Sequence, residues 1–466
     1  MVKRLAKGHW YAQRSSVCGL LHVVYPGLDA AGQAEVLGIV GALSADAAAM
    51  VRRSLAEYLV HLIPLVAPQG VKTYIHPVFL ALAKDDQDSV RMLAAALCVP
   101  MAKAVAPGEI AAAVIPTFQA AAADAAWRVR YNIAVHFADL QTAVGPALTN
   151  TALFPSFVAL LADSEAEVRT AISLKLLLFC RSLSDDVRVT KTLAEVVPKI
   201  QALVVDDSQH VRAAIASVIM GLAILVGKEN TIAHLLPLFL TLLKDEFSEV
   251  RLNIISNLDE VGKCIGIDQL SAALKPAINE LAQHDEWRVR QSIIDHIPSV
   301  ARQLGVTFFD AELKELCLGW LEDKVYTVRR AAVENIKKVI EMFGIDWAIA
   351  AGSVLPTVLN TSSGTSSYAA RLVAVFTIDS LIAICPQEVV LNYLVPPLCN
   401  HLYTDKVANI RFNVAKTLEK LLPHVTKGVF QAQIKTVLET MKRDADRDVK
   451  FFAGRALAQA GILNLA

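Results

Sequence analysis

The sequence predicts an all-α solenoid of about twelve repeats, each built from two antiparallel helices. The first observation is a Val-Arg dipeptide, or a close substitute, that returns at nearly constant spacing along the 466 residues. In most copies an acid stands five positions before the apolar residue, which we call the anchor. The anchors are Val51, Val90, Val129, Val168, Val211, Val250, Val289, Val328, Ala370, Ile410 and Val449, at steps of 39, 39, 39, 43, 39, 39, 39, 42, 40 and 39 residues. A diverged twelfth copy lies upstream, with Gln13 and Arg14 in the anchor places, so the chain is an array rather than one globular core.

A period near 39 residues has room for two helices and two turns, which is typical of HEAT or armadillo-type repeats. Prolines recur with the same period, as at Pro237, and we expect each to open the first helix, where its missing N–H had no partner anyway. After Val211, apolar residues follow at positions 214, 215, 218, 219 and 222, the spacing of a helix with a broad buried stripe. We expect the aspartate of each copy to accept N–H groups at the start of this second helix.

The acid and the arginine of each copy predict a ladder along the array. The arginine lies one turn into the second helix, and we expect it to reach the equivalent aspartate of a neighbouring repeat rather than remain a solvated charge. The predicted ladder residues are Asp46, Arg52, Arg91, Asp124, Arg130, Asp163, Arg169, Asp206, Arg212, Asp245, Arg251, Arg290, Asp323, Arg329, Asp405, Arg411 and Asp444.

Composition excludes several classes of protein. Net charge is zero and the pI is about 7.2, so no basic field invites nucleic acid. Mean hydropathy is high, +0.44, but the longest clean apolar stretch, 213–227, is short for a membrane span and coincides with a second helix, so no span is expected. The seven cysteines are too scattered for a disulfide framework or a zinc site. With no apolar signal segment at the N-terminus, we expect a cytosolic or nuclear protein.

Enzyme signatures are missing from the sequence. No P-loop, Gly-x-Gly-x-x-Gly or His-x-x-x-His pattern occurs. The His284-Asp285-Glu286 run occupies a turn that is polar in every repeat, so we interpret it as structural. We therefore expect no catalytic residue, no cofactor and no metal.

Large aromatic residues stand inside the predicted turns between paired helices. They are Trp10, Trp127, Trp287, Tyr326 and Tyr368, and Trp-Arg-Val-Arg occurs twice. Because aromatic and arginine side chains dominate interface hot spots, the row of turns is a candidate docking surface. The alternative is that each indole folds over its own turn.

Four stretches resemble one particular family. Residues 206–261, 124–146, 286–310 and 405–421 are similar to the scaffolding A subunit of protein phosphatase 2A, a HEAT-repeat family. The resemblance implies a non-catalytic horseshoe that holds a phosphatase catalytic subunit on its C-terminal repeats and an exchangeable regulatory (B-type) subunit on its N-terminal ones. Here it implies one solenoid over 1–466, with 1–165 facing the regulatory subunit and 280–466 facing the catalytic subunit.

The same resemblance assigns turn residues to each partner. Matching the regulatory-subunit side are Trp10, Arg53, Trp127 and Arg128; matching the catalytic-subunit side are Trp287, Arg288, Tyr326, Tyr368 and Val407. The chain departs from the family at Ala47–Ala49 and in the turn 362–369. It also has fewer repeats, all of the difference lying at the N-terminus, where only about seven residues precede the first copy. We expect either a truncated chain or an end that a partner covers.

Two other classes stay open. A karyopherin-like transport receptor is also a helical solenoid, although neutral charge and regular 39-residue steps favour the scaffold. A solenoid enzyme would need a cluster of titratable groups, which the sequence does not show.

Overall fold

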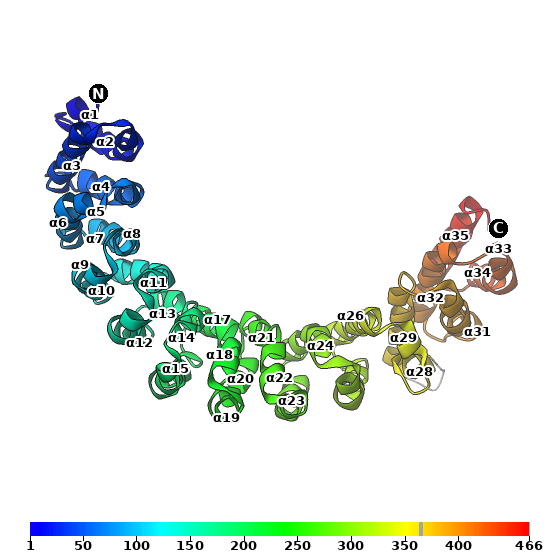
Figure 1. The fold of residues 1–466 in the computed structure, drawn as a ribbon. Helices are drawn as coiled ribbons and strands as arrows, with labels where there is room; N and C mark the ends of the chain where they lie inside the picture. Colours follow the sequence, from blue (N-terminus) through cyan, green and yellow to red (C-terminus); the bar gives the residue numbers. More distant parts are fainter. Residues whose placement is uncertain (363–366, 466) are drawn as a thin grey trace. The chain divides into compact units, whose positions relative to one another are not determined.

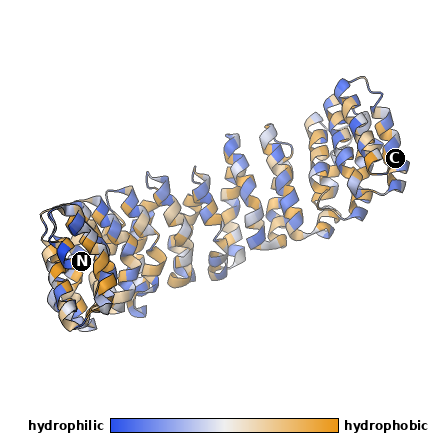
Figure 2. Cartoon of the chain, turned by 90° about the horizontal axis from the view of Figure 1, so that it is seen from above, coloured by the Kyte–Doolittle hydropathy of each residue, from blue (hydrophilic) through white to orange (hydrophobic). Residues whose placement is uncertain are grey.

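The structure is a computed structural model that describes residues 1–362 and 367–465, without the side chains of residues 259 and 267. Within these ranges the chain forms paired helices and no strand, which confirms the predicted all-α solenoid. The chain divides into two compact units, Met1–Ile265 and Gly266–Ala466. Figure 1 shows the order of the helices, and Figure 2 shows hydrophobic and hydrophilic bands alternating along them.

The first unit contains seven helix pairs. The first helices are formed, pair by pair, by α1 (Val2–Ala6); α3 (Ala30–Ser44); α5 (Pro68–Gly70) with η3 (Val71–Ile75) and α6 (His76–Ala83); η4 (Pro107–Glu109) with α9 (Ile110–Ala113) and α10 (Ile115–Ala122); η5 (Thr149–Leu153) with α12 (Phe154–Leu160); α15 (Asp185–Lys191) with η6 (Thr192–Val196) and α16 (Val197–Leu203); and α19 (Lys228–Asn230) with η8 (Thr231–Leu235) and α20 (Leu236–Leu243). The second helices are α2 (Tyr11–Val24) with η1 (Tyr25–Gly27); α4 (Ala49–Leu62) with η2 (Ile63–Leu65); α7 (Asp88–Ala96) with α8 (Cys98–Ala104); α11 (Trp127–Leu148); α13 (Ala166–Ser173) with α14 (Leu176–Arg181); α17 (Gln209–Val218) with η7 (Ile219–Gly221) and α18 (Leu222–Val226); and α21 (Ser248–Ile255) with α22 (Leu258–Ile265).

The second unit contains five pairs in the part of it that is described. Its first helices are α23 (Ile267–Ala282); η9 (Phe309–Leu313) with α25 (Lys314–Trp320); α27 (Ile345–Ile349) with α28 (Val354–Asn360); α30 (Gln387–Val389) with η10 (Val390–Leu394), α31 (Val395–Asn400) and η11 (Leu402–Thr404); and α33 (Lys427–Val429) with η13 (Phe430–Ile434) and α34 (Lys435–Met441). Its second helices are α24 (Trp287–Phe308), α26 (Tyr326–Phe343), α29 (Tyr368–Leu381), α32 (Ala408–Leu421) with η12 (Leu422–His424), and α35 (Arg447–Ile462).

Prolines do not open most first helices, contrary to expectation. In the third pair the helix runs without a break over 68–83, and Pro77 lies near its middle, just after the π-helical turn η3. Proline cannot donate to the carbonyl four residues earlier and clashes with it, so a local π turn lets the helix continue past the ring. Similar π turns precede Pro155, Pro198, Pro237 and Pro396.

Each helix packs mainly on its equivalents in adjacent repeats. In the first unit the second helices α2, α4, α7 and α11 form one row, while the first helices α3, α6 and α10 form another (Figure 1). Nearly all the anchor residues are fully buried, as Val129 and Val168 show. The rows are filled by apolar side chains, including Phe157 and Phe179, whose rings stack at 3.7 Å. Because every repeat buries its apolar stripe only against neighbours, the intra-repeat turns are left at one edge of each unit.

Glycines in the left-handed region separate one pair from the next. Gly227 (φ 83°) ends α18, and Gly344 (φ 93°) ends α26. A Cβ atom is disfavoured at such angles, so glycine suits the residue where a second helix stops and the chain reverses.

Candidate functional site: the ridge of intra-repeat turns

An arginine and an aspartate hold each intra-repeat turn in place. Arg52 Nε lies 2.5 Å from Asp85 Oδ2, and its Nη2 lies 2.9 Å from Asp85 Oδ1, so the contact with the next repeat is bidentate. Arg52 Nη1 also donates to the Asp46 carbonyl of its own turn at 2.8 Å. The Asp85 carboxylate accepts the Gln87 N–H at 2.9 Å. One guanidinium therefore fixes two successive turns.

This arrangement repeats along both units. The Nε to Oδ2 distances lie between 2.5 and 2.8 Å in the pairs Arg14–Asp46, Arg52–Asp85, Arg91–Asp124, Arg130–Asp163, Arg169–Asp206, Arg212–Asp245, Arg290–Asp323, Arg371–Asp405 and Arg411–Asp444. Three of these residues, Arg14, Asp85 and Arg371, were not among the predicted ladder positions, although the 39-residue spacing points to each of them.

The pairing shifts the pKa values of the carboxylates. The hydrogen bond from Arg14 lowers the pKa of Asp46, and the hydrogen bond from Arg91 lowers that of Asp124. Asp444 responds in the same way to Arg411. These three carboxylates therefore stay ionised to a lower pH than a free aspartate does.

Two predicted ladder arginines make a different contact, with a backbone carbonyl of their own turn. Arg251 donates to the Asp245 carbonyl, and the sequence has His284 where the acid of the next repeat would stand. Burial lowers the pKa of Arg251, partly offset by the charge of Asp245. Arg329 donates to the Asp323 carbonyl at 2.6 Å; the position equivalent to its acid, 365, lies outside the described residues.

The aspartates also act differently from the expected helix caps. Asp46 Oδ1 accepts the N–H of Ala48, which is itself the N-cap residue of α4, and Ala48 makes no side-chain cap. The aspartate thus closes the turn just before the helix, because the neighbouring arginine draws its carboxylate toward the adjacent repeat. His284 takes the same place in its turn, where its Nδ1 accepts the Glu286 N–H at 3.1 Å.

The two Trp-Arg turns have nearly the same geometry in the two units. Trp127 and Trp287 are both half-buried at the first position of their second helices, α11 and α24. The guanidinium of the following arginine, Arg128 or Arg288, stands 4.7 Å from the indole centroid in each case. Both arginines are exposed, so each turn presents an indole under a cation.

The remaining predicted contact residues lie in turns of the same kind. Trp10 is 73% exposed before α2, and Tyr326 and Tyr368 are 51% and 40% exposed where α26 and α29 begin. Arg53 and Val407 are half-buried; Arg53 lies one turn into α4, and Val407 is the N-cap of α32. All of these aromatic residues stand at the starts of second helices, so within its own unit each lies beside turns that the arginine–aspartate pairs join.

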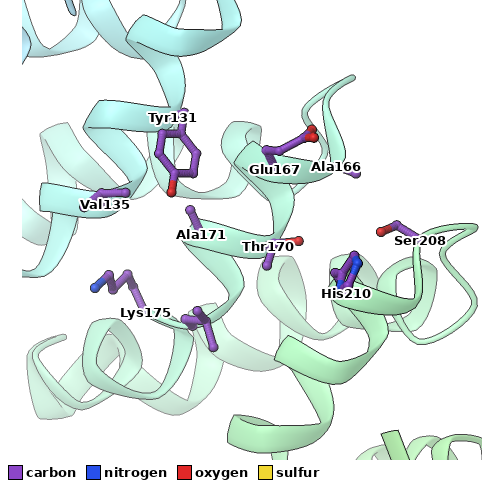
Figure 3. A pocket seen from close by; sticks show the side chains of 10 residues that line it. Tyr131, Val135, Ala166, Glu167, Thr170, Ala171, Lys175, Ser208 and His210 are labelled. Atoms are coloured by element: carbon purple, nitrogen blue, oxygen red, sulfur yellow. The ribbon is translucent and has the colours of Figure 1, made fainter. Parts of the chain in front are cut away.

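A groove in the first unit was not foreseen from the sequence. It has a volume of about 400 Å³ and lies among α11, α13 and α17. Figure 3 shows Tyr131 and Val135 on one side, His210 and Ser208 on the other, and the short side chains of Ala166, Thr170 and Ala171 between them. Tyr131 meets Trp127 edge to face, with ring centroids 6.3 Å apart, so the groove adjoins the Trp127 turn.

Metal-binding groups are not gathered in the described part of the chain. It contains no group of three or more His, Cys, Asp or Glu residues placed to hold a metal ion. Burial raises the pKa of Cys98 and Cys180 to about 12, which disfavours the reactive thiolate.

Two helical stretches are long and apolar enough to cross a membrane, 127–160 and 209–226. The first is interrupted by Gly145, whose φ is 80°. The second is α17 to α18, which packs in the row of second helices. Core helices of an array satisfy the same length test, so these stretches are weak evidence of a span.

Family models match two adjacent segments of the first unit. Residues 146–227 match the model of a PPP2R1A-like HEAT repeat, and residues 235–265 match that of a HEAT repeat. A serine/threonine-protein phosphatase PP2A 65 kDa regulatory subunit from Drosophila melanogaster is 51% identical over 57 residues, 12% of this chain and 10% of that protein. The A-type regulatory subunit of protein phosphatase PP2A from Saccharomyces cerevisiae is 35% identical over 99 residues, 20% of this chain and 15% of that protein. The matched segments thus span a tenth to a seventh of these relatives.

The solved structures with similar folds include karyopherins. Kap121p bound to Nup53p aligns with 98% of this chain and 48% of its own length, with a TM-score of 0.67 and 11% identity. Kap95p in complex with RanGDP gives a TM-score of 0.56 at 12% identity, covering 98% of this chain and 62% of its own. At such identity the likeness concerns the fold alone.

Proposed function

We propose that this chain is a non-catalytic scaffold that assembles a protein serine/threonine phosphatase 2A holoenzyme. The observation that carries the proposal is the match of residues 146–227 to a PPP2R1A-like HEAT repeat, together with the 51% identity to a PP2A 65 kDa regulatory subunit. In this proposal the second unit binds the catalytic subunit and the first unit binds an exchangeable regulatory subunit. The assembly would act in the cytosol or the nucleus.

The turn geometry supports this role physically. Indoles held under exposed guanidiniums, as at Trp127 and Trp287, are the kind of side chain that carries interface free energy. The arginine–aspartate pairs hold the turns in place. The exposed aromatic side chains of the turns are therefore ordered before a partner arrives, and little further ordering is needed on binding. Because both partners are held by one chain, each meets the other at a high effective concentration.

The assignment of partners to units is tested with two matched substitutions. Trp287→Ala is expected to weaken binding of the purified phosphatase 2A catalytic subunit by about 2–4 kcal/mol, as for a hot-spot aromatic. Trp127→Ala removes the same indole–guanidinium pair from the other unit and is expected to leave catalytic-subunit affinity unchanged. Both affinities are measured by titration calorimetry on the full chain. Equal losses for the two variants, or none for Trp287→Ala, would contradict the assignment.

A karyopherin-like transport adaptor is the second candidate. The observation that favours it is the fold likeness to Kap121p over 98% of the chain. Binding of a Ran-type GTPase in its GTP form separates the two proposals, because a phosphatase scaffold has no reason to bind that protein.

A further inference from the structure

The groove at Tyr131, Thr170 and His210 exists because α13 carries small side chains where α11 carries a large one. Two residues after the anchor, α11 carries Tyr131, whereas α13 carries Thr170. The neighbouring positions of α13 are alanines, Ala166 and Ala171. The short side chains of α13, between Tyr131 on α11 and His210 on α17, therefore leave a hollow along α13; Figure 3 shows these residues.

The floor of the groove is lined by apolar side chains, some of which are exposed to solvent. Val135 and Ala171 line it, and Leu174 at its end is 49% exposed. Leu178, one turn further along α14, is 52% exposed. Exposed aliphatic side chains that gather beside a hollow are typical of a docking site rather than of scattered surface residues.

Polar groups without a partner surround this floor. Within the described residues the Tyr131 hydroxyl, Glu167, Lys175 and His210 form no hydrogen bond or ion pair through their side chains, while most of the surrounding arginines and aspartates are paired in the ladder. Glu167 lies in the first turn of α13, and Lys175 is the N-cap residue of α14, two residues after α13 ends. At a rise of 1.5 Å per residue, eight residues place the two Cα positions roughly 12 Å apart along the helix direction. The groove thus has a negative end and a positive end.

From this arrangement we infer that the groove binds a short peptide segment of a partner protein. The segment places one large apolar side chain on Val135, Ala171 and Leu174. It carries a basic residue toward Glu167 and a carboxylate toward Lys175. A peptide fits better than a small molecule because the hollow is open along one side, whereas small-molecule sites enclose most of their ligand.

The Trp127 turn positions one wall of the groove. The edge-to-face contact with Trp127 holds the Tyr131 ring, and Arg128 lies over the Trp127 indole. The peptide site therefore shares the Trp127 turn with the proposed docking edge, but it does not depend on a bound phosphatase subunit, and it goes beyond the scaffold function proposed above. A chain that bound no phosphatase subunit would still contain the groove.

The experiment is a selection of random twelve-residue peptides displayed on phage against the full purified chain. We expect enriched peptides that share an apolar residue flanked by one basic and one acidic residue. Synthetic versions of them should lose at least about tenfold in affinity for Thr170→Trp, which fills the floor. The matched control is Leu252→Trp, at the same position of α21, which should bind as the unchanged chain does. Circular dichroism verifies that both variants fold.

A charge exchange supplies the second arm. The double variant Glu167→Lys with Lys175→Glu should prefer peptides with the two flanking charges exchanged. Several outcomes would overturn the inference. They are a selection that enriches no peptide, enriched peptides that bind Thr170→Trp as tightly as the unchanged chain, or peptides whose affinity does not respond when the two charges of the groove are exchanged. Sedimentation of the chain alone is the remaining check. If it dimerises, and Thr170→Trp abolishes the dimer, the occupant is a second copy and not a peptide.

Discussion

The two units differ in how completely arginine–aspartate pairs join their turns. In the first unit six pairs link seven consecutive turns, from Arg14–Asp46 to Arg212–Asp245. In the second unit Arg290–Asp323 is followed by Arg329, which donates to a backbone carbonyl and has no ion pair within the described residues. The comparison shows that the arginine has two separable roles, closing its own turn and joining that turn to the next repeat.

Removing one acid from the complete ladder should have the largest effect. Asp85→Ala leaves Arg52 with an incompletely compensated charge in a half-buried site and frees the Gln87 N–H. Breaking such a pair costs about 2–3 kcal/mol of unfolding free energy, somewhat below a fully buried pair. Urea unfolding followed by circular dichroism measures the loss.

The adjacent acid provides the control for this change. Asp86 also contacts Arg52, at 2.7 Å, but its side chain is 76% exposed. Asp86→Ala should therefore cost less than about 1 kcal/mol. Equal losses for the two variants would show that proximity to Arg52, and not the buried bidentate geometry, determines the effect.

Within the second unit the two roles of the arginine can be compared directly. Arg290→Leu removes both the pair with Asp323 and the bond to the His284 carbonyl, whereas Arg329→Leu removes a carbonyl contact and a contact with the Tyr326 ring. We expect Arg290→Leu to lower the unfolding free energy by about 2 kcal/mol more than Arg329→Leu does. Thermal and urea unfolding of the two variants gives the difference, and a reversed order would refute the distinction between the roles.

Acid should weaken the ladder in both units. The pKa of Asp124 in the folded chain is lowered by Arg91 from the ordinary 3.8, and the pKa of Asp444 is lowered by Arg411. The stability from such a group is fully present above the unfolded pKa and is lost as pH falls from about 4 through the folded pKa. Asp124→Asn should be less stable at neutral pH and should lose less stability on acidification; an unchanged acid limb would argue against the pairing.

The smallest signal is the order in which buried thiols become reactive. Burial raises the pKa of Cys180 in the first unit and of Cys399 in the second unit to about 12, so neither should react with a disulfide reagent in the native chain near pH 8. In increasing urea, Cys399 should react before Cys180, because fewer ion pairs join the described turns of its unit. Mass spectrometry of labelled peptides identifies each thiol, and the opposite order would contradict the comparison.

The fold could be predicted from the sequence because the residues that recur at constant spacing are the ones that the helices bury. Val129 and its equivalents recur at nearly constant spacing, and a helix pair with one apolar stripe per helix can satisfy that pattern only by stacking. The reach of Arg52 to the next aspartate follows from the same spacing. The prediction that prolines open the first helices was wrong for most of them. Pro77 is tolerated inside a helix because a π turn precedes it, and no local sequence pattern predicts that turn.

Features that depend on the packing of neighbouring side chains could not be predicted from the sequence of a single repeat. The position of the Arg128 guanidinium over the Trp127 indole depends on how the two side chains are oriented at the start of the helix. The groove arises from the contrast between Tyr131 and Thr170 at equivalent positions, which becomes meaningful only when α11 and α13 are known to lie side by side. Aligning the repeats by their anchors and comparing side-chain size at each position would have revealed it.

The central claim is that one chain holds two phosphatase subunits at once. The most direct measurement is light scattering during size-exclusion chromatography of this chain mixed with a phosphatase 2A catalytic subunit and a B-type regulatory subunit. We expect a complex with one copy of each protein, which Trp287→Ala depletes of the catalytic subunit. Failure of both subunits to co-elute with the chain, or displacement of one subunit by the other, would contradict the claim.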